Sequence, residues 1–125
     1  MFSKPTKNTT DNLGKTNRIV QDTEIIGDIF SEADFRLDGT LKGNFTCNGK
    51  LVIGPKGKII GDIKCLNLDI EGTFEGNVEV QQQIAIRAQA TIIGHLKMNQ
   101  LLVEAGANFN ATCEMLGTQK LVEVE

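Results

Sequence analysis

The sequence contains no tryptophan and no tyrosine, and its only aromatic residues are six phenylalanines. Globular cores usually rely on bulkier aromatic side chains, so this composition indicates a thin core built from aliphatic residues. Prolines are also scarce, with two in the whole chain against thirteen glycines. This ratio favours many tight turns over long rigid linkers.

Long apolar runs are missing as well. No stretch approaches the roughly 20 apolar residues that a membrane-spanning helix needs, and the N-terminus lacks the apolar centre of a signal peptide. The three cysteines are an odd number without metal-ligand spacing, which is consistent with a reducing compartment. We therefore expect a cytoplasmic protein.

Positive charge is concentrated at the N-terminus. The net charge is -3 over 125 residues, but residues 1–18 carry four basic side chains and one acid. This segment has almost no apolar content and is expected to be disordered. The remainder is strongly acidic, which gives no support for binding to a nucleic-acid backbone. A chain of this length has room for one domain with its own core.

A glycine-centred pentapeptide recurs along the chain. The letters IIGDI stand at residues 25–29 and again 34 positions later, and successive copies are separated by 16, 18, 15, 18 and 17 residues. Apolar residues lie two positions before and two positions after each central residue, so they share one face of a strand. The six copies are IIGDI (25–29), LKGNF (41–45), IIGDI (59–63), FEGNV (74–78), IIGHL (92–96) and FNATC (109–113).

A period of about 17 residues is typical of one coil of a β-solenoid, because it is too short for two packed helices or a crossover helix. We predict an all-β, single-domain parallel β-helix of about six coils of 15–18 residues. Coils stacked at roughly 4.8 Å would make a rod about 29 Å long. The predicted boundaries are a disordered basic tail at 1–18, the β-helix at 19–118, and a short tail or last partial coil at 119–125.

Two corner lengths account for most of the irregular spacing between copies of the pentapeptide. The last inward residue of one coil and the first of the next are four apart at 37–41 and 70–74, and six apart at 53–59 and 86–92. The alternation predicts a two-coil repeat of 33 or 34 residues. It lapses at residues 104–108, where a second long corner follows.

The coils resemble those of the bactofilins, bacterial polymer-forming cytoskeletal proteins. The resemblance covers residues 19 to about 118 and is carried by LDGTLKGNF, LVIGPKGKIIGDI and IEGTFEGNV. It implies a right-handed β-helix, assembly into filaments through end-to-end contacts without nucleotide, and association with the inner face of the cytoplasmic membrane. It further implies scaffolding of cell-shape or cell-envelope machinery, with peptidoglycan-remodelling enzymes or polar proteins as partners.

The first residues of the chain, MFSK, resemble the short membrane-targeting sequence of many bactofilins. Phe2 is suited to the headgroup boundary, while Lys4 and Lys7 would each gain about 1 kcal/mol near anionic lipid. A filament would multiply the effect of one weak anchor. The predicted membrane-targeting residues are Met1, Phe2, Ser3, Lys4 and Lys7.

The terminal coils are the predicted polymer contacts. A solenoid exposes unpaired N–H and C=O groups at its first and last coils unless a cap covers them. The contact would join like ends or run head to tail; alternatively, these coils are simply fraying ends. We expect Phe30 to point outward from the first coil. The predicted contact residues are Ile25, Ile29, Phe30 and Phe35 at one end and Phe109, Met115 and Leu116 at the other.

No catalytic, metal or cofactor residues are predicted. His95 follows a bend glycine and is expected on the surface, although left-handed β-helix acyltransferases use a coil-borne histidine as a base. Such an enzyme, acting as a trimer, is the alternative function, but its strict hexapeptide spacing is absent. Cys47 and Cys65 fall in one column on adjacent coils, within reach of a disulfide; we expect them, like Cys113, to be small core residues. A secreted adhesive β-helix would need an export signal.

Overall fold

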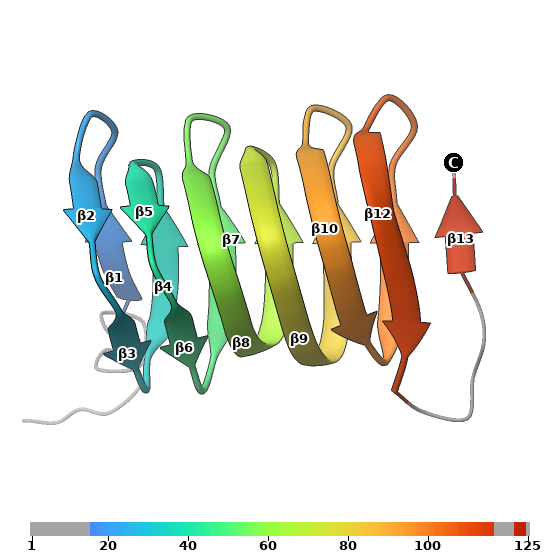
Figure 1. The fold of residues 1–125 in the computed structure, drawn as a ribbon, viewed down its shortest axis with the longest axis horizontal. Coiled ribbons are helices and arrows are strands. Elements are labelled where there is room, and N and C mark those ends of the chain that lie inside the picture. Colours follow the sequence, from blue (N-terminus) through green and yellow to red (C-terminus); the bar gives the residue numbers. More distant parts are fainter. Residues whose placement is uncertain (1–15, 117–121, 125) are drawn as a thin grey trace, which may run out of the picture.

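The structure is a computed structural model that describes residues 16–116 and the backbone of 122–124. In this part of the chain every regular element is a β-strand, and every strand pairing is parallel. The predicted all-β parallel solenoid of about six coils is confirmed (Figure 1). The strands are β1 (Thr16–Ile19), β2 (Glu24–Ile26), β3 (Ile29–Ser31), β4 (Asp34–Leu37), β5 (Thr40–Lys42), β6 (Phe45–Cys47), β7 (Lys50–Ile53), β8 (Lys58–Ile70), β9 (Thr73–Ile86), β10 (Thr91–Met98), β11 (Gln100–Val103), β12 (Asn108–Met115) and β13 (Val122–Val124).

The helix is right-handed. In Figure 1 the nearer strands, such as β2 and β12, run downward, and the fainter, more distant strands, such as β4, run upward. The chain advances from left to right as it turns in this sense. The handedness that the bactofilin resemblance implied is therefore the observed one.

Each coil has three sides, represented in the first coils by β2, β3 and β4. The sides of successive coils stack in register, so each inward residue lies beside its counterpart on the next coil. This arrangement confirms the predicted inward columns. The column that starts at Ile25 continues through Leu41, Ile59, Phe74, Ile92 and Phe109.

The core is the narrow space enclosed by these columns. Its fully buried residues are almost all aliphatic, and Phe74 is the largest of them. Leu41, Ile59 and Ile84 are each 0% exposed. Burying such a side chain contributes about 1.5–3 kcal/mol, and each residue is enclosed by counterparts from the coils on either side. The rod is therefore stabilised mainly by contacts between coils.

The glycine at the centre of each pentapeptide makes the bend between the first and second sides. Gly61 has a φ of +145°, and a Cβ there would overlap the carbonyl oxygen of Gly43 on the preceding coil. Only glycine combines this φ with such a close backbone approach. In the last copy Ala111 replaces glycine, has no positive φ, and packs partly against the core, so the bend ends with the fifth copy.

The corner between the second and third sides of a coil also varies in length, and the sequence did not predict this variation. Opposite Cys65 and Asn67 stand Val80 and Gln83, so β8 has one residue fewer than β9 between its second and third sides. The same shortening recurs after Met98. The alternating corners account for steps of 16 and 18 residues, and this second corner produces those of 15 and 17.

Paired strands also occur before the first pentapeptide and after the last one. β1 begins at Thr16 and places Ile19 beside Leu37, which supplies a third side for the first coil. At the other end the backbone of β13 pairs with β11. The membrane-targeting residues predicted at Met1 to Lys7 lie outside the described residues.

An outward column follows the glycines and alternates acids with amides over its first four coils. The backbone N–H of Asn44 donates to Asp28 at 3.0 Å, and the Asn77 amide donates to Asp62 at 3.3 Å. Asp28 and Asp62 are exposed on the same side, as the repeat predicts. Because the amide of Asn44 lies on the coil between them, the two carboxylates do not face each other directly and their repulsion is avoided.

Replacing Gly61 with alanine should destabilise the rod by about 3 kcal/mol or more, because strain at positive φ adds to a backbone overlap that a neighbouring coil cannot relieve. Gly27→Ala is the matched control: its φ is +134°, but a Cβ there meets nothing within 4 Å. It should cost about 1–2 kcal/mol. Unfolding followed by circular dichroism measures both, and equal losses would contradict the overlap.

Candidate functional site: the two ends of the rod

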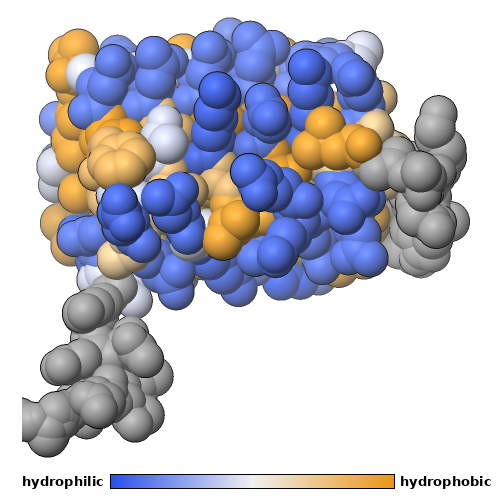
Figure 2. Space-filling view, turned by 90° about the horizontal axis from the view of Figure 1, so that it is seen from below, coloured by the Kyte–Doolittle hydropathy of each residue, from blue (hydrophilic) through white to orange (hydrophobic). Residues whose placement is uncertain are grey.

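The first coil leaves one edge of each of its strands open. β1, β2 and β3 pair only with β4, β5 and β6 of the next coil, and their other edges have no partner among the described residues. Figure 2 shows apolar residues gathered at this left-hand end, while the flank of the rod is mostly hydrophilic. Open edges pair readily with another chain.

The axis-facing side chains at this end are only half covered. Ile19, Ile25 and Ile29 are intermediate in exposure, whereas their counterparts one coil further in are buried. The corner beside them is polar, because the Asn17 amide donates to the Ser31 hydroxyl at 3.1 Å. The end surface thus has an apolar centre and a polar corner.

The two phenylalanines predicted for this end have different positions. Phe30 points outward from β3 and is 65% exposed, as expected. Phe35 is 5% exposed, lies beneath β1, and packs edge to face against Phe45 with ring centroids 4.9 Å apart. Phe35 therefore belongs to the core of the rod and not to its end surface.

The last coil has the same kind of end. β12 pairs only with β10, and β13 only with β11, among the described strands. Phe109 and Met115 face the axis and are partly buried against the core. Leu116 is 45% exposed, and its backbone N–H is bonded to the Met98 carbonyl at 2.7 Å. A second rod stacked on either end would cover apolar side chains and pair open strand edges together.

The comparisons with known proteins agree with this geometry. The bactofilin family model, described as polymer-forming cytoskeletal, matches residues 17–114. The chain belongs to the bactofilin family. The match extends from β1 into β12 and so includes strands at both ends of the rod. No curated protein and no solved structure matched the chain.

The family description makes this bactofilin a structural, polymer-forming protein. Within the described part of the chain, no helix has the length and apolar character to cross a membrane. Likewise, in residues 16–116 no three His, Cys, Asp or Glu side chains are grouped to hold a metal ion. The ends of the rod are its strongest candidate sites, because they combine open strand edges with half-covered apolar side chains.

His95 and the cysteines occupy ordinary places in a solenoid. The His95 side chain is 39% exposed, meets the Thr112 hydroxyl through Nδ1, and lies 3.6 Å from Glu114 through Nε2. Cys47, Cys65 and Cys113 are free. Burial raises the pKa of Cys65 to about 12, which keeps its thiol protonated at neutral pH and unreactive.

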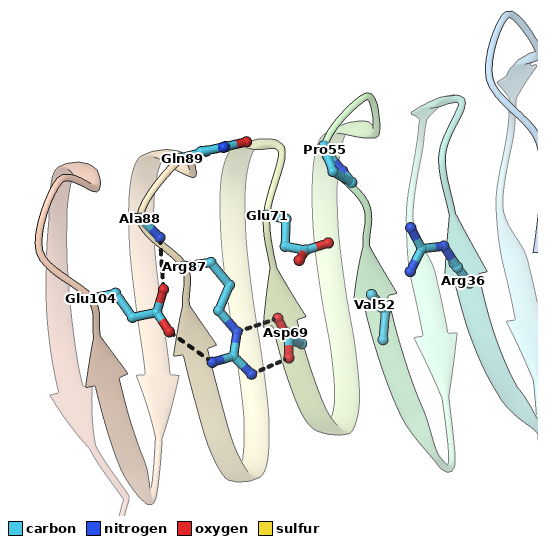
Figure 3. A pocket seen from close by; sticks show the side chains of 9 residues that line it. All are labelled: Arg36, Val52, Pro55, Asp69, Glu71, Arg87, Ala88, Gln89 and Glu104. Atoms are coloured by element: carbon cyan, nitrogen blue, oxygen red, sulfur yellow. Dashed lines mark hydrogen bonds and ion pairs between the residues drawn. The ribbon is translucent and has the colours of Figure 1, made fainter.

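An arginine cluster on the third side was not predicted from the sequence. Arg87 donates to both carboxylate oxygens of Asp69, at 3.0 and 2.7 Å, and to Glu104 at 3.0 Å (Figure 3). Glu104 also accepts from the backbone N–H of Ala88 at 3.0 Å. The three charged residues come from three successive coils. The hydrogen bonds that Arg87 donates to Asp69 and Glu104 raise the pKa of Arg87 above its ordinary value.

This cluster lines an open groove of about 620 Å³. Arg36 stands further along the groove and is paired within its own coil to Asp38, at 2.9 and 3.1 Å. Arg87 is engaged by two carboxylates, which leaves it less free to bind a ligand. Its arrangement indicates a structural connection between coils. The outward columns would have revealed it, because Arg87 falls between Glu71 and Glu104 in the repeat.

Replacing Arg87 with methionine should cost about 1–2 kcal/mol, since hydrogen bonds to two partly exposed carboxylates on neighbouring coils are lost. Arg36→Met is the matched control, because its ion pair is local and joins no coils. The loss there should be within about 0.5 kcal/mol of zero. Chemical denaturation measures the two values, and an Arg36 effect as large as that of Arg87 would contradict the inter-coil role.

Proposed function

We propose that this bactofilin is a cytoskeletal scaffold whose rods join end to end into filaments without nucleotide. The filaments lie at the inner face of the cytoplasmic membrane and organise cell-shape or cell-envelope machinery. One observation carries the proposal: both ends of the described rod combine open strand edges with half-covered apolar side chains on the axis.

The chemistry of such a junction supports assembly without an energy source. Ile25 and Ile29 at one end, and Phe109 and Met115 at the other, each lack the neighbour that buries their counterparts inside the rod. Covering the exposed part of each side chain would contribute about 1 kcal/mol, and pairing the strand edges would add hydrogen bonds. Burial and backbone pairing alone favour the polymer, so nucleotide hydrolysis has no necessary role.

Phe109→Arg should abolish filaments, because it places a charge in the dry centre of the junction at a cost of several kcal/mol. Asn110→Arg is the control: it adds the same charge one residue along β12 with its side chain outward. Negative-stain microscopy without nucleotide reads out filaments, and circular dichroism confirms the fold. A folded Phe109→Arg protein that still forms filaments would remove the C-terminal end from the contact.

The oligomeric state of the Phe109→Arg protein distinguishes the two filament arrangements. If like ends meet, the blocked rods still pair through their N-terminal ends, and sedimentation gives dimers. If the junction is head to tail, every contact needs a C-terminal end, and sedimentation gives monomers. Ile25→Arg gives the complementary measurement at the other end.

The membrane part of the proposal rests on the N-terminal segment. Residues 1–18 carry an excess of three positive charges, with Phe2 beside Lys4 and Lys7. β1 begins at Thr16 in the first coil, so each rod would contribute one such segment to a filament. A single segment binds anionic lipid weakly, but many segments on one filament bind together.

Phe2→Glu should reduce co-sedimentation with anionic vesicles about tenfold, because the aromatic insertion is lost and a negative charge faces the lipid. Thr6→Glu adds the same charge and keeps Phe2, so it should retain most of the binding. Undiminished binding of Phe2→Glu filaments would exclude Phe2 from the anchor. The filament-deficient Phe109→Arg protein should also bind weakly, through loss of multivalency.

A further inference from the structure

One outward column on the first side of the rod has an unusual order of residues. The side chains just before the bend alternate between isoleucine and polar residues along the rod, in exact strand register. Ile26 is 77% exposed and Ile93 is 43% exposed. From the first coil to the last, the column is Ile26, Lys42, Ile60, Glu75, Ile93 and Asn110.

The rod leaves the Ile26 and Ile93 side chains exposed and covers Ile60 in part, since Ile60 is intermediate in exposure. Adjacent coils are about 4.8 Å apart, so successive isoleucines lie about 10 Å from one another with a polar residue between them. The second side differs, because its column Lys64, Glu79, Lys97 and Glu114 sets opposite charges on adjacent coils. On the first side no opposite charges meet on adjacent coils of this column, because Ile60 stands between Lys42 and Glu75.

We propose that two rods pair side by side and antiparallel through this face, with Ile60 of each copy at the two-fold axis. The proposal rests on the filament function proposed above, since filaments present this face many times. In this register Ile26 of one copy lies opposite Ile93 of the other, and Lys42 lies opposite Glu75. Every apolar residue therefore meets an apolar residue, and each of the two charges meets its opposite.

The other registers are less favourable. An axis at Lys42 or at Glu75 places that charge against its own copy, and an axis between two coils places charged residues opposite isoleucines. An axis at Ile26 or at Ile93 leaves Lys42 without Glu75 opposite it. A parallel pair with this column at the contact places Lys42 against Lys42 and Glu75 against Glu75. Like charges at close range are costly, so the sequence of this one column selects the antiparallel pair centred on Ile60.

The two charged residues are available for such contacts. Lys42 is 52% exposed and uses one contact, to Glu24 at 3.0 Å, within its own rod. Its ammonium has three donors. Glu75 is exposed and forms no ion pair among the described residues. The neighbouring column opposes the pair at one point, where Lys58 would face its own copy across the axis; its counterparts on adjacent coils are Thr40 and Thr73.

Because this face is small, we expect pairing between filaments and not between isolated rods. The stripe runs over about 24 Å and is one strand wide, far below the roughly 800 Å² per partner of a stable complex. Two isolated rods would therefore remain apart. Along two filaments the same weak contact repeats at every subunit, and the contacts add.

The charge pair provides the test. In wild-type preparations examined by electron microscopy, we expect paired filaments. Glu75→Lys and Lys42→Glu should each reduce the paired fraction about tenfold while filaments persist. The double variant Lys42→Glu/Glu75→Lys should restore it to within about twofold of wild type. Rescue cannot arise inside one rod, because Lys42 and Glu75 lie two coils apart. Glu24→Gln, which breaks the internal ion pair of Lys42, should leave pairing intact.

The isoleucine at the axis and Lys58 extend the test. Ile60→Asp should give single filaments of normal length, and Lys58→Thr should increase pairing. The proposal is overturned if the double variant stays unpaired, if Ile60→Asp filaments pair normally, or if wild-type filaments are all single. Vesicle binding that depends on Ile60 in unpaired filaments would overturn it in favour of lipid. Absence of wild-type filaments would instead count against the function on which it rests.

Discussion

The parallel backbone ladder between coils is the constraint on which the rest of the rod depends. Each residue is held beside its counterpart one coil away, at the fixed spacing of hydrogen-bonded strands. The ladder brings Gly61 so close to the carbonyl of Gly43 that no larger residue fits, and it brings Leu41 against Ile59 in the core. The neighbours of a side chain are thus chosen by the register of its coil.

The same constraint gives the rod its two kinds of surface. Along the flanks, adjacent coils satisfy one another, as Arg87 does by binding Asp69 and Glu104 on either side. At the ends this mutual satisfaction stops, and Ile25 and Phe109 retain exposed area that interior residues lose. Because each coil is stabilised by the coils on either side, each terminal coil lacks one stabilising neighbour. This property is expected of a polymer-forming subunit.

Most of the interior could be predicted from the sequence, because the side-chain period of a strand is local. The inward columns, the outward Phe30 and the glycine bend all follow from alternation around one repeated pentapeptide. Phe35 was misplaced because the strand that covers it, Thr16–Ile19, has a single apolar residue and no glycine-centred repeat. The Arg87 cluster lies on the outward face, where the repeat aligns Glu71, Arg87 and Glu104; its bidentate bond to Asp69 is diagonal to that column and depends on how the coils stack.

The two-coil repeat has a further consequence for the polymer. Six stacked positions hold three whole surface repeats, so the length of the subunit is commensurate with the pattern on its side. In a head-to-tail filament, Asn110 of one subunit would precede Ile26 of the next, and the alternation would continue unbroken. A like-to-like junction would instead set two equivalent coils together and reverse the pattern. The polarity of the junction therefore determines whether the alternation of isoleucine and polar residues runs in one direction along a long filament or reverses at every junction.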